Sequence, residues 1–141
     1  MDKKQIVLAG LYPASQKNHT PVQVQKLFFL LDKNIPQLID GPLFDFQPYN
    51  YGPFDKNVYR TIEELSEEGL VEINPAFSML TYRLTSEGQN EGEKIFNSLD
   101  PVAQKYINEI SNFVLTHSFS SLVSAIYKAY PDMRQNSVFQ D

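Results

Sequence analysis

The most regular apolar pattern follows Thr20 and predicts a buried α-helix. Thr20 suits the N-cap, Pro21 suits the first helical position, and Gln23 completes a capping box. The apolar positions that follow keep the i, i+3, i+4, i+7 spacing of one helical face, and two neighbours widen that face: Val24, Leu27, Phe28 and Leu31, with Phe29 and Leu30. Because the face is so wide, the second half of this helix should be buried nearly all round.

Similar stripes and capping residues predict five further helices. The first ends before Pro13, because the residue preceding a proline avoids the α region. A stripe starting at Phe54 predicts the third helix, with Gly69 as its left-handed end. Ser86 opens a second capping box, and Asp100 caps the helix after it. Together with a strongly amphipathic last helix, these five cover residues 3–11, 54–68, 86–99, 101–116 and 119–130.

Alternation of apolar and polar residues predicts three short strands. Residues 44–47 form one, which Pro48 should end. Residues 70–73 and 80–84 form an antiparallel hairpin whose broad tip covers residues 74–79. A hairpin placed after a helix in this way has the geometry of a wing.

Tyr51, Gly52, Pro53 and Phe54 predict a rigid aromatic turn that leads into the third helix. Pro53 fixes φ at the helix start, and Gly52 allows an unusual backbone angle. The favoured interpretation is that the rings pack the connecting segment onto the core. An exposed aromatic interface patch is the alternative.

These elements predict a mostly α-helical α+β protein with a small antiparallel β wing. We expect one domain over residues 1–141, made of a winged-helix-like core (1–99), a C-terminal helical pair (100–131) and a polar tail (132–141). A helix–turn–helix normally has a turn of 3–4 residues, whereas roughly 17 residues separate the second and third helices here. Binding of a DNA groove therefore does not follow from the expected fold.

Composition narrows the class of protein. Of the 141 residues, 42% are hydrophobic, which is ample for the core of one soluble domain. There is no cysteine, which excludes disulfides and thiolate metal sites and suits a cytoplasmic protein. The net charge is −5 with 12 Lys and Arg, and a protein contacting 6–10 phosphates of a duplex would engage most of those cations. Nucleic acid is therefore disfavoured, and the apolar runs are too short to predict a membrane span.

Candidate catalytic residues are sparse. His19 is expected in a solvated loop beside Thr20, and His117 at a helix end, where a cation interacts favourably with the dipole. The sequence has no phosphate loop, dinucleotide fingerprint or nucleophile elbow. We therefore expect no catalytic residue, no metal site and no cofactor, and a protein that is not an enzyme.

The solvent side of the third helix offers two sets of candidate contacts. For DNA binding, the early positions are suitable residue types, since Arg can bind guanine, Asn adenine and Lys phosphate: Lys56, Asn57, Arg60 and Thr61. Four glutamates follow that would repel phosphate and would suit a basic protein partner: Glu63, Glu64, Glu67 and Glu68. Surface solubility is the simplest interpretation of both sets, and a protein interface ranks above DNA.

Several segments together carry a resemblance to a known group. Residues 25–32 read QKLFFLLD, residues 51–54 read YGPF, and residues 68–71 read EGLV. The segment of roughly residues 21–84 resembles the SocA-like (Panacea) antitoxin-domain group and its winged-helix relatives. In that group a helix with a QKLLYLL-type core is followed by an aromatic segment, YGP and a helix ending GLI. Residues 126–131, followed by Ser137, are also similar to relatives of this kind.

The resemblance implies a non-enzymatic regulator, often an antitoxin that binds and neutralises a toxin or adapts it to another protein. Our leading hypothesis is therefore a small regulatory module whose partner is a protein, such as a toxin. The alternative is a winged-helix DNA-binding transcriptional regulator that acts as a homodimer. Neither hypothesis involves a membrane.

Overall fold

The chain is helical over most of its length. The computed structural model describes residues 1–140, which contain six α-helices: α1 (Lys3–Leu11), α2 (Pro21–Asn34), α3 (Lys56–Glu67), α4 (Ser86–Ser98), α5 (Pro101–Thr116) and α6 (Phe119–Ala129). Short 3₁₀ helices follow three of them: η1 (Tyr12–Ala14), η2 (Pro36–Leu38) and η3 (Pro131–Arg134). The predicted class, mostly α with a small antiparallel hairpin, is confirmed.

Two antiparallel hairpins complete the secondary structure of residues 1–140. One pairs β1 (Gln47–Tyr49) with β2 (Gly52–Phe54), and the other pairs β3 (Val71–Ala76) with β4 (Met79–Leu84). The β3–β4 hairpin is the predicted one, but its expected broad tip is wrong. The strands stay in register up to the pair Ala76–Met79, so that only Phe77 and Ser78 form the turn.

The β1–β2 hairpin corrects two predictions from the sequence. A strand over residues 44–47 is not formed, because Phe44 is buried and its amide donates to the carboxylate of Asp32 on α2. Pro48 does not end a strand but lies within β1, opposite Pro53, where two residues that lack an amide proton face one another. The predicted aromatic turn over residues 51–54 is only in part a turn. Tyr51 lies in the turn, whereas Gly52–Phe54 forms strand β2.

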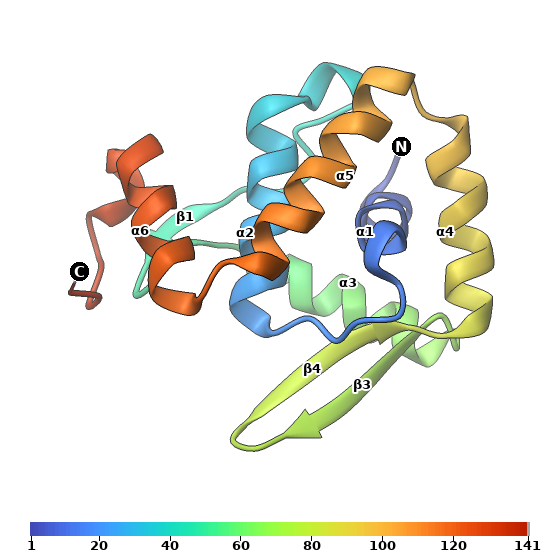
Figure 1. Cartoon of the computed structure of the whole chain (residues 1–141), viewed down its shortest axis with the longest axis horizontal. Helices are drawn as coiled ribbons and strands as arrows, with labels where there is room; N and C mark the ends of the chain where they lie inside the picture. Colours follow the sequence, from blue (N-terminus) through green and yellow to red (C-terminus); the bar gives the residue numbers. More distant parts are fainter. Residues whose placement is uncertain (141) are drawn as a thin grey trace.

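Helix α2 is the central element of the fold. It contacts α1, α3 and α5, and the β1–β2 hairpin extends from its side toward α6 (Figure 1). Residues 24–32 of α2 are all buried, which confirms the prediction that its second half is enclosed nearly all round. One hydrophobic core joins α1, α2, α3, α5 and α6, with Ile6, Phe28, Ile62, Ile107 and Ile126 among its members.

Most helix ends follow the predicted capping chemistry. The capping box of Thr20 and Gln23 is present, and Asp100 caps α5. Gly69 takes a φ of 79° directly after α3 and its C-cap. Two starts differ by one or two residues. Asp55, not Phe54, precedes α3 as its N-cap, and the N-cap of α4 is Thr85, whose hydroxyl accepts from the Gly88 amide.

The segment expected to be a polar tail packs against the hairpin instead. Met133 is buried in the core, and the amide of Val138 donates to the carbonyl of Asn50 in the β1–β2 turn. The side chain of Asn136 donates to the carbonyl of Pro48. The backbone that follows α6 therefore lies along the hairpin, as Figure 1 shows.

The helices are short. The longest of those described, α5, has 16 residues, whereas a membrane span needs roughly 20 apolar residues. Within residues 1–140 no helix has both the length and the apolar character required to cross a membrane.

Candidate functional site

The early positions of α3 differ in their exposure. Lys56 and Arg60 are exposed, as DNA contact would require. Thr61 is buried, and its hydroxyl donates to the carbonyl of Asn57 one turn earlier. Thr61 is therefore wrongly placed among the candidate DNA contacts, because its side chain already bonds within its own helix. The backbone amide of Asn57 is held by the Asp55 cap.

The four glutamates of the predicted interface are all exposed, but they fall into two pairs. Glu64 and Glu68 turn toward α1, where Lys4 lies 3.7 Å and 2.5 Å from their carboxylates. The pKa of Tyr82 on β4 is raised by burial and, to a smaller extent, by the charge of Glu63, which therefore acts on the β3–β4 hairpin. Lys4 partly neutralises Glu64 and Glu68, so the acidic surface open to a partner centres on Glu63 and Glu67.

The tip of the β3–β4 hairpin is apolar and exposed. Phe77 is fully exposed at the turn, and Met79 and Leu80 beside it are each about half exposed. Phe77 also has a positive φ of 57°, which is unusual for an aromatic residue. Helix α3 packs against β3 at the base of the same hairpin (Figure 1). The sequence showed these apolar residues, but only the pairing register places them at a two-residue tip.

Polar side chains of α2 hold the long segment between α2 and α3. The amide of Gln25 donates to the carbonyl of Asp55 at 2.9 Å and accepts from the amide of Asp55 at 3.0 Å. The two carboxylate oxygens of Asp32 accept from the backbone amides of Leu43 and Phe44. A segment that appeared only as a long connector in the sequence is therefore fixed at both ends.

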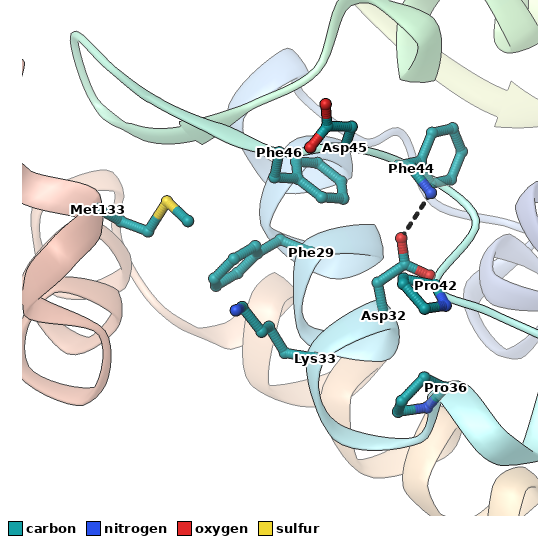
Figure 2. Close-up of a pocket in the computed structure, with 9 residues that line it drawn as sticks. All are labelled: Phe29, Asp32, Lys33, Pro36, Pro42, Phe44, Asp45, Phe46 and Met133. Carbon is teal, nitrogen blue, oxygen red and sulfur yellow. Dashed lines mark hydrogen bonds between the residues drawn. The ribbon is translucent and has the colours of Figure 1, made fainter.

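A pocket of about 290 Å³ opens beside Asp32 (Figure 2). Figure 2 shows the carboxylate turned toward the backbone nitrogen of Phe44, with Phe29, Phe46 and Met133 on the other side of the pocket. Burial raises the pKa of Asp32 even though its two backbone hydrogen bonds act in the opposite direction. Because both oxygens already bond the main chain, Asp32 is best understood as a structural residue.

A second pocket, of about 190 Å³, lies between α2 and the β1–β2 hairpin. Four of its ten lining residues are aromatic and one is a cation. Val22, Lys26, Tyr49, Tyr51, Phe54 and Tyr59 are among the residues that form it. The rings pack against one another, with centroids of Tyr49 and Phe54 at 5.0 Å and of Phe54 and Tyr59 at 5.7 Å. Tyr49 and Tyr51 remain about half exposed at its rim.

Lys26 is the unusual member of this second pocket. It is only 3% exposed, and its Nζ atom lies 3.4 Å from the carbonyl oxygen of Pro53. Burial lowers the pKa of Lys26 to about 8. Its position beside Gly52 and Pro53 connects two of the segments, QKLFFLLD and YGPF, that carry the resemblance.

The signal that could have identified Lys26 was present in the sequence. A helix whose second half is expected to be buried nearly all round has three polar residues within or directly beside its apolar stretch, namely Gln25, Lys26 and Asp32. Such residues must find partners inside the protein. The sequence could not show which partners, because these lie 11 to 30 positions further along the chain.

The prediction that His19 lies in a solvated loop is wrong. The residue is 1% exposed, and its backbone exchanges both hydrogen bonds with Tyr82 of β4. Burial lowers the pKa of His19 to about 4, so the ring is neutral near pH 7. The loop before α2 is thus paired to the β3–β4 hairpin, and the imidazole is buried. His117 is exposed after α5, with Nδ1 2.8 Å from the carbonyl oxygen of Phe113.

In the part of the chain that the structure describes, no three histidine or acidic side chains are grouped so that they could hold a metal ion. No protein-family model matches the chain, and no curated protein matches its sequence.

Proposed function

We propose that this protein is a non-enzymatic, cytoplasmic regulatory module of the antitoxin type, which binds a protein partner. The binding surface consists of the tip of the β3–β4 hairpin (Phe77, Met79, Leu80) and the exposed acidic side of α3 (Glu63, Glu67). The observation that carries this proposal is the full exposure of Phe77 beside two further half-exposed apolar side chains. Clustered exposed apolar side chains of this kind are typical of protein interfaces.

The charge of α3, which packs against β3 at the base of the hairpin, adds a second requirement for the partner. Glu63 and Glu67 are exposed on α3, so a complementary surface would present an apolar pocket for Phe77 and, separately, Lys or Arg side chains that face α3. Opposite charges at the rim of an interface accelerate association and select among partners. The resemblance of residues 25–32 and 51–54 to SocA-like proteins supports a toxin as that partner.

Binding of DNA by the same helix and hairpin is less well supported. Arg83 is the only Lys or Arg in the hairpin sequence, and it lies directly opposite Glu72 in the strand register. On α3, Lys56 and Arg60 are followed by glutamates, which repel phosphate. The β3–β4 hairpin has an apolar tip and one cation that faces an acidic residue, so it has few groups that could bind DNA phosphates.

The test begins with a tagged chain purified from its native host and identification of the protein it captures. That protein is then titrated with the wild-type chain and with Phe77→Asn combined with Leu80→Thr. Asn tolerates a positive φ well, so the change at the tip should not disturb the hairpin. The matched control is Val102→Thr, which removes an exposed apolar residue of α5 far from the tip. We expect at least tenfold weaker binding for the tip variant and unchanged binding for the control.

A second pair of variants tests the charge. Glu63→Lys with Glu67→Lys should weaken partner binding, mostly through a slower association rate. Glu91→Lys with Glu109→Lys makes the same change in net charge on exposed positions of α4 and α5 and should leave binding unchanged. If the captured protein slows growth when expressed alone and the chain restores growth, the antitoxin assignment is supported; a harmless partner would contradict it.

Binding to duplex DNA tests the alternative function, a transcriptional regulator. We expect fluorescence anisotropy at physiological salt to show binding no tighter than the non-specific range of roughly 10⁻⁴–10⁻⁶ M. Tight, sequence-selective binding that is lost on Lys56→Ala with Arg60→Ala would replace this proposal with a transcriptional regulator.

A further inference from the structure

Lys26 carries a buried charge that no carboxylate of the described chain neutralises. Within residues 1–140 it forms no ion pair, and its one hydrogen bond is to the Pro53 carbonyl at 3.4 Å, beyond the usual N–H···O range. An ammonium group has three donors, so two of them lack a protein acceptor. Because burying an unpaired charge is costly, an ammonium retained in such a place calls for an anion from outside the chain.

The surroundings of the ammonium leave room for that anion. Gly52 has a φ of 104°, and a Cβ at this position would lie 3.3 Å from Nζ of Lys26 and 3.4 Å from Cε1 of Tyr127. The missing side chain therefore keeps the space beside Nζ open. Lys26, Gly52 and Pro53 all line the 190 Å³ pocket, and Nζ lies beside the backbone of the latter two.

The lining of the pocket indicates what else the ligand contains. Tyr49, Tyr51, Phe54 and Tyr59 surround the pocket with aromatic rings, and Val22 adds an aliphatic side chain. Gln25 also borders it, but its amide already bonds Asp55 through both of its ends. At about 190 Å³ the pocket is smaller than the 300–1,000 Å³ typical of cofactor and drug sites. It therefore suits a small apolar or aromatic group rather than a nucleotide.

We propose that this pocket, here named the Lys26 pocket, binds the carboxylate of a small apolar or aromatic ligand, with the Lys26 ammonium as its counter-ion. A carboxylate is favoured over a phosphate, because a phosphate group carries up to two charges and three acceptor oxygens, whereas the pocket offers a single cation. The apolar body of the ligand would pack against the rings of Tyr49, Phe54 and Tyr59, which contact one another.

Two sources can supply this chemistry, namely a free aromatic acid or the carboxyl-terminal residue of a polypeptide. The Lys26 pocket is formed by α2, the β1–β2 hairpin and Tyr59, whereas the proposed partner surface is formed by the β3–β4 tip and the solvent side of α3. The proposal does not depend on the proposed function, and either can fail alone.

The experiment titrates ¹⁵N-labelled protein with three probes: benzoate, the dipeptide acetyl-Ala-Phe with a free carboxylate, and the same dipeptide with an amidated end. We expect benzoate to shift the amide signals of Gly52 and Tyr51 with a Kd of about 1 mM, and Lys26→Met to weaken binding at least tenfold. Removing an unpaired buried charge should not unfold the protein, which circular dichroism can verify. The matched control is Lys33→Met, an exposed lysine on the same helix that does not line the Lys26 pocket.

A second measurement keeps the proposal testable if the Met variant fails to fold. Only the ammonium form can pair with a carboxylate, so wild-type affinity for benzoate should fall about tenfold between pH 7 and pH 9. If the free dipeptide binds more tightly than benzoate, the natural ligand is the carboxyl-terminal residue of a polypeptide. If benzoate binds more tightly, the natural ligand is a free aromatic acid. Equal binding of the free and amidated dipeptides, benzoate binding that Lys26→Met leaves unchanged, or no binding of either acid at 10 mM would overturn the proposal.

Discussion

The Nζ atom of Lys26 lies 3.4 Å from the carbonyl oxygen of Pro53, which joins the middle of α2 to strand β2. Gln25, the preceding residue, bonds both backbone groups of Asp55, and Asp32 holds the amides of Leu43 and Phe44. Three polar side chains of one buried helix thus fix three points of the segment that follows it. The long connection between α2 and α3 is therefore an ordered part of the fold, and it forms one wall of the Lys26 pocket.

Replacing Gln25 with Leu should destabilise the protein by about 2–4 kcal/mol. The substitution leaves the buried N–H of Asp55 without a partner, which costs roughly 1–3 kcal/mol. It also removes a hydrogen bond of roughly 1 kcal/mol to the Asp55 C=O, which still accepts from the Val58 amide. Chemical denaturation measures the effect. Gln37→Leu, at an exposed position of η2, changes the same functional group and should leave the midpoint nearly unchanged. Equal midpoints for the two variants would show that the Gln25 bonds do not hold the segment.

Much of the fold could be predicted because it depends on local signals. The capping box at Thr20 and the left-handed Gly69 are properties of a few neighbouring residues, and both are confirmed. The β1–β2 hairpin was missed because its strands are three residues long and contain two prolines, which local rules exclude from strands. They pair because α2, α6 and the segment after α6 pack around them, and those contacts are distant in sequence.

The candidate site was harder to predict for the same reason. The charges of α3 could be assigned to its solvent side from helical spacing, but Thr61 is buried, and Lys4 draws Glu64 and Glu68 toward α1. The burial of Lys26 depends on a hairpin about 27 positions further along the chain. A lysine in an apolar helix indicates that its ammonium group must have a partner inside the protein. Only the tertiary structure shows that this partner is a single carbonyl oxygen and not a carboxylate.

Gly52→Ala should destabilise the protein by more than the ~1–2 kcal/mol that a left-handed backbone costs an L-residue. Besides the strain at φ 104°, the new Cβ would lie 3.3 Å from Nζ of Lys26 and 3.4 Å from Tyr127. Gly69→Ala is the matched control, because Gly69 also has a positive φ, of 79°, but no atom lies within 4 Å of the position of its Cβ. The loss of unfolding free energy in Gly52→Ala minus the loss in Gly69→Ala therefore measures the cost of the close contacts of the new Cβ. A smaller loss at Gly52 than at Gly69 would mean that the space beside Lys26 is not constrained.

His19 should make stability depend on pH. Its pKa is about 4 in the folded protein and 6.5 without burial, so the unfolded chain binds more protons between these values. Stability is complete above pH 6.5 and should fall by up to about 3 kcal/mol as the pH is lowered to 4. Denaturation of His19→Leu should lack this component, whereas exposed His117→Leu should retain it. Parallel pH profiles for the two variants would contradict the burial of His19.

The most direct measurement is an NMR titration of the lysine side chains in the free, wild-type protein. Selective ¹³C labelling at Cε reports the protonation of each lysine separately. Burial without a counter-ion should place the pKa of Lys26 at about 8, below the usual 10.5. Saturating benzoate should then raise the pKa of Lys26 alone, since a bound carboxylate stabilises its ammonium form. A Lys26 pKa of 10.5 in the free protein would show that the ammonium is solvated and would contradict an unpaired buried cation in this pocket.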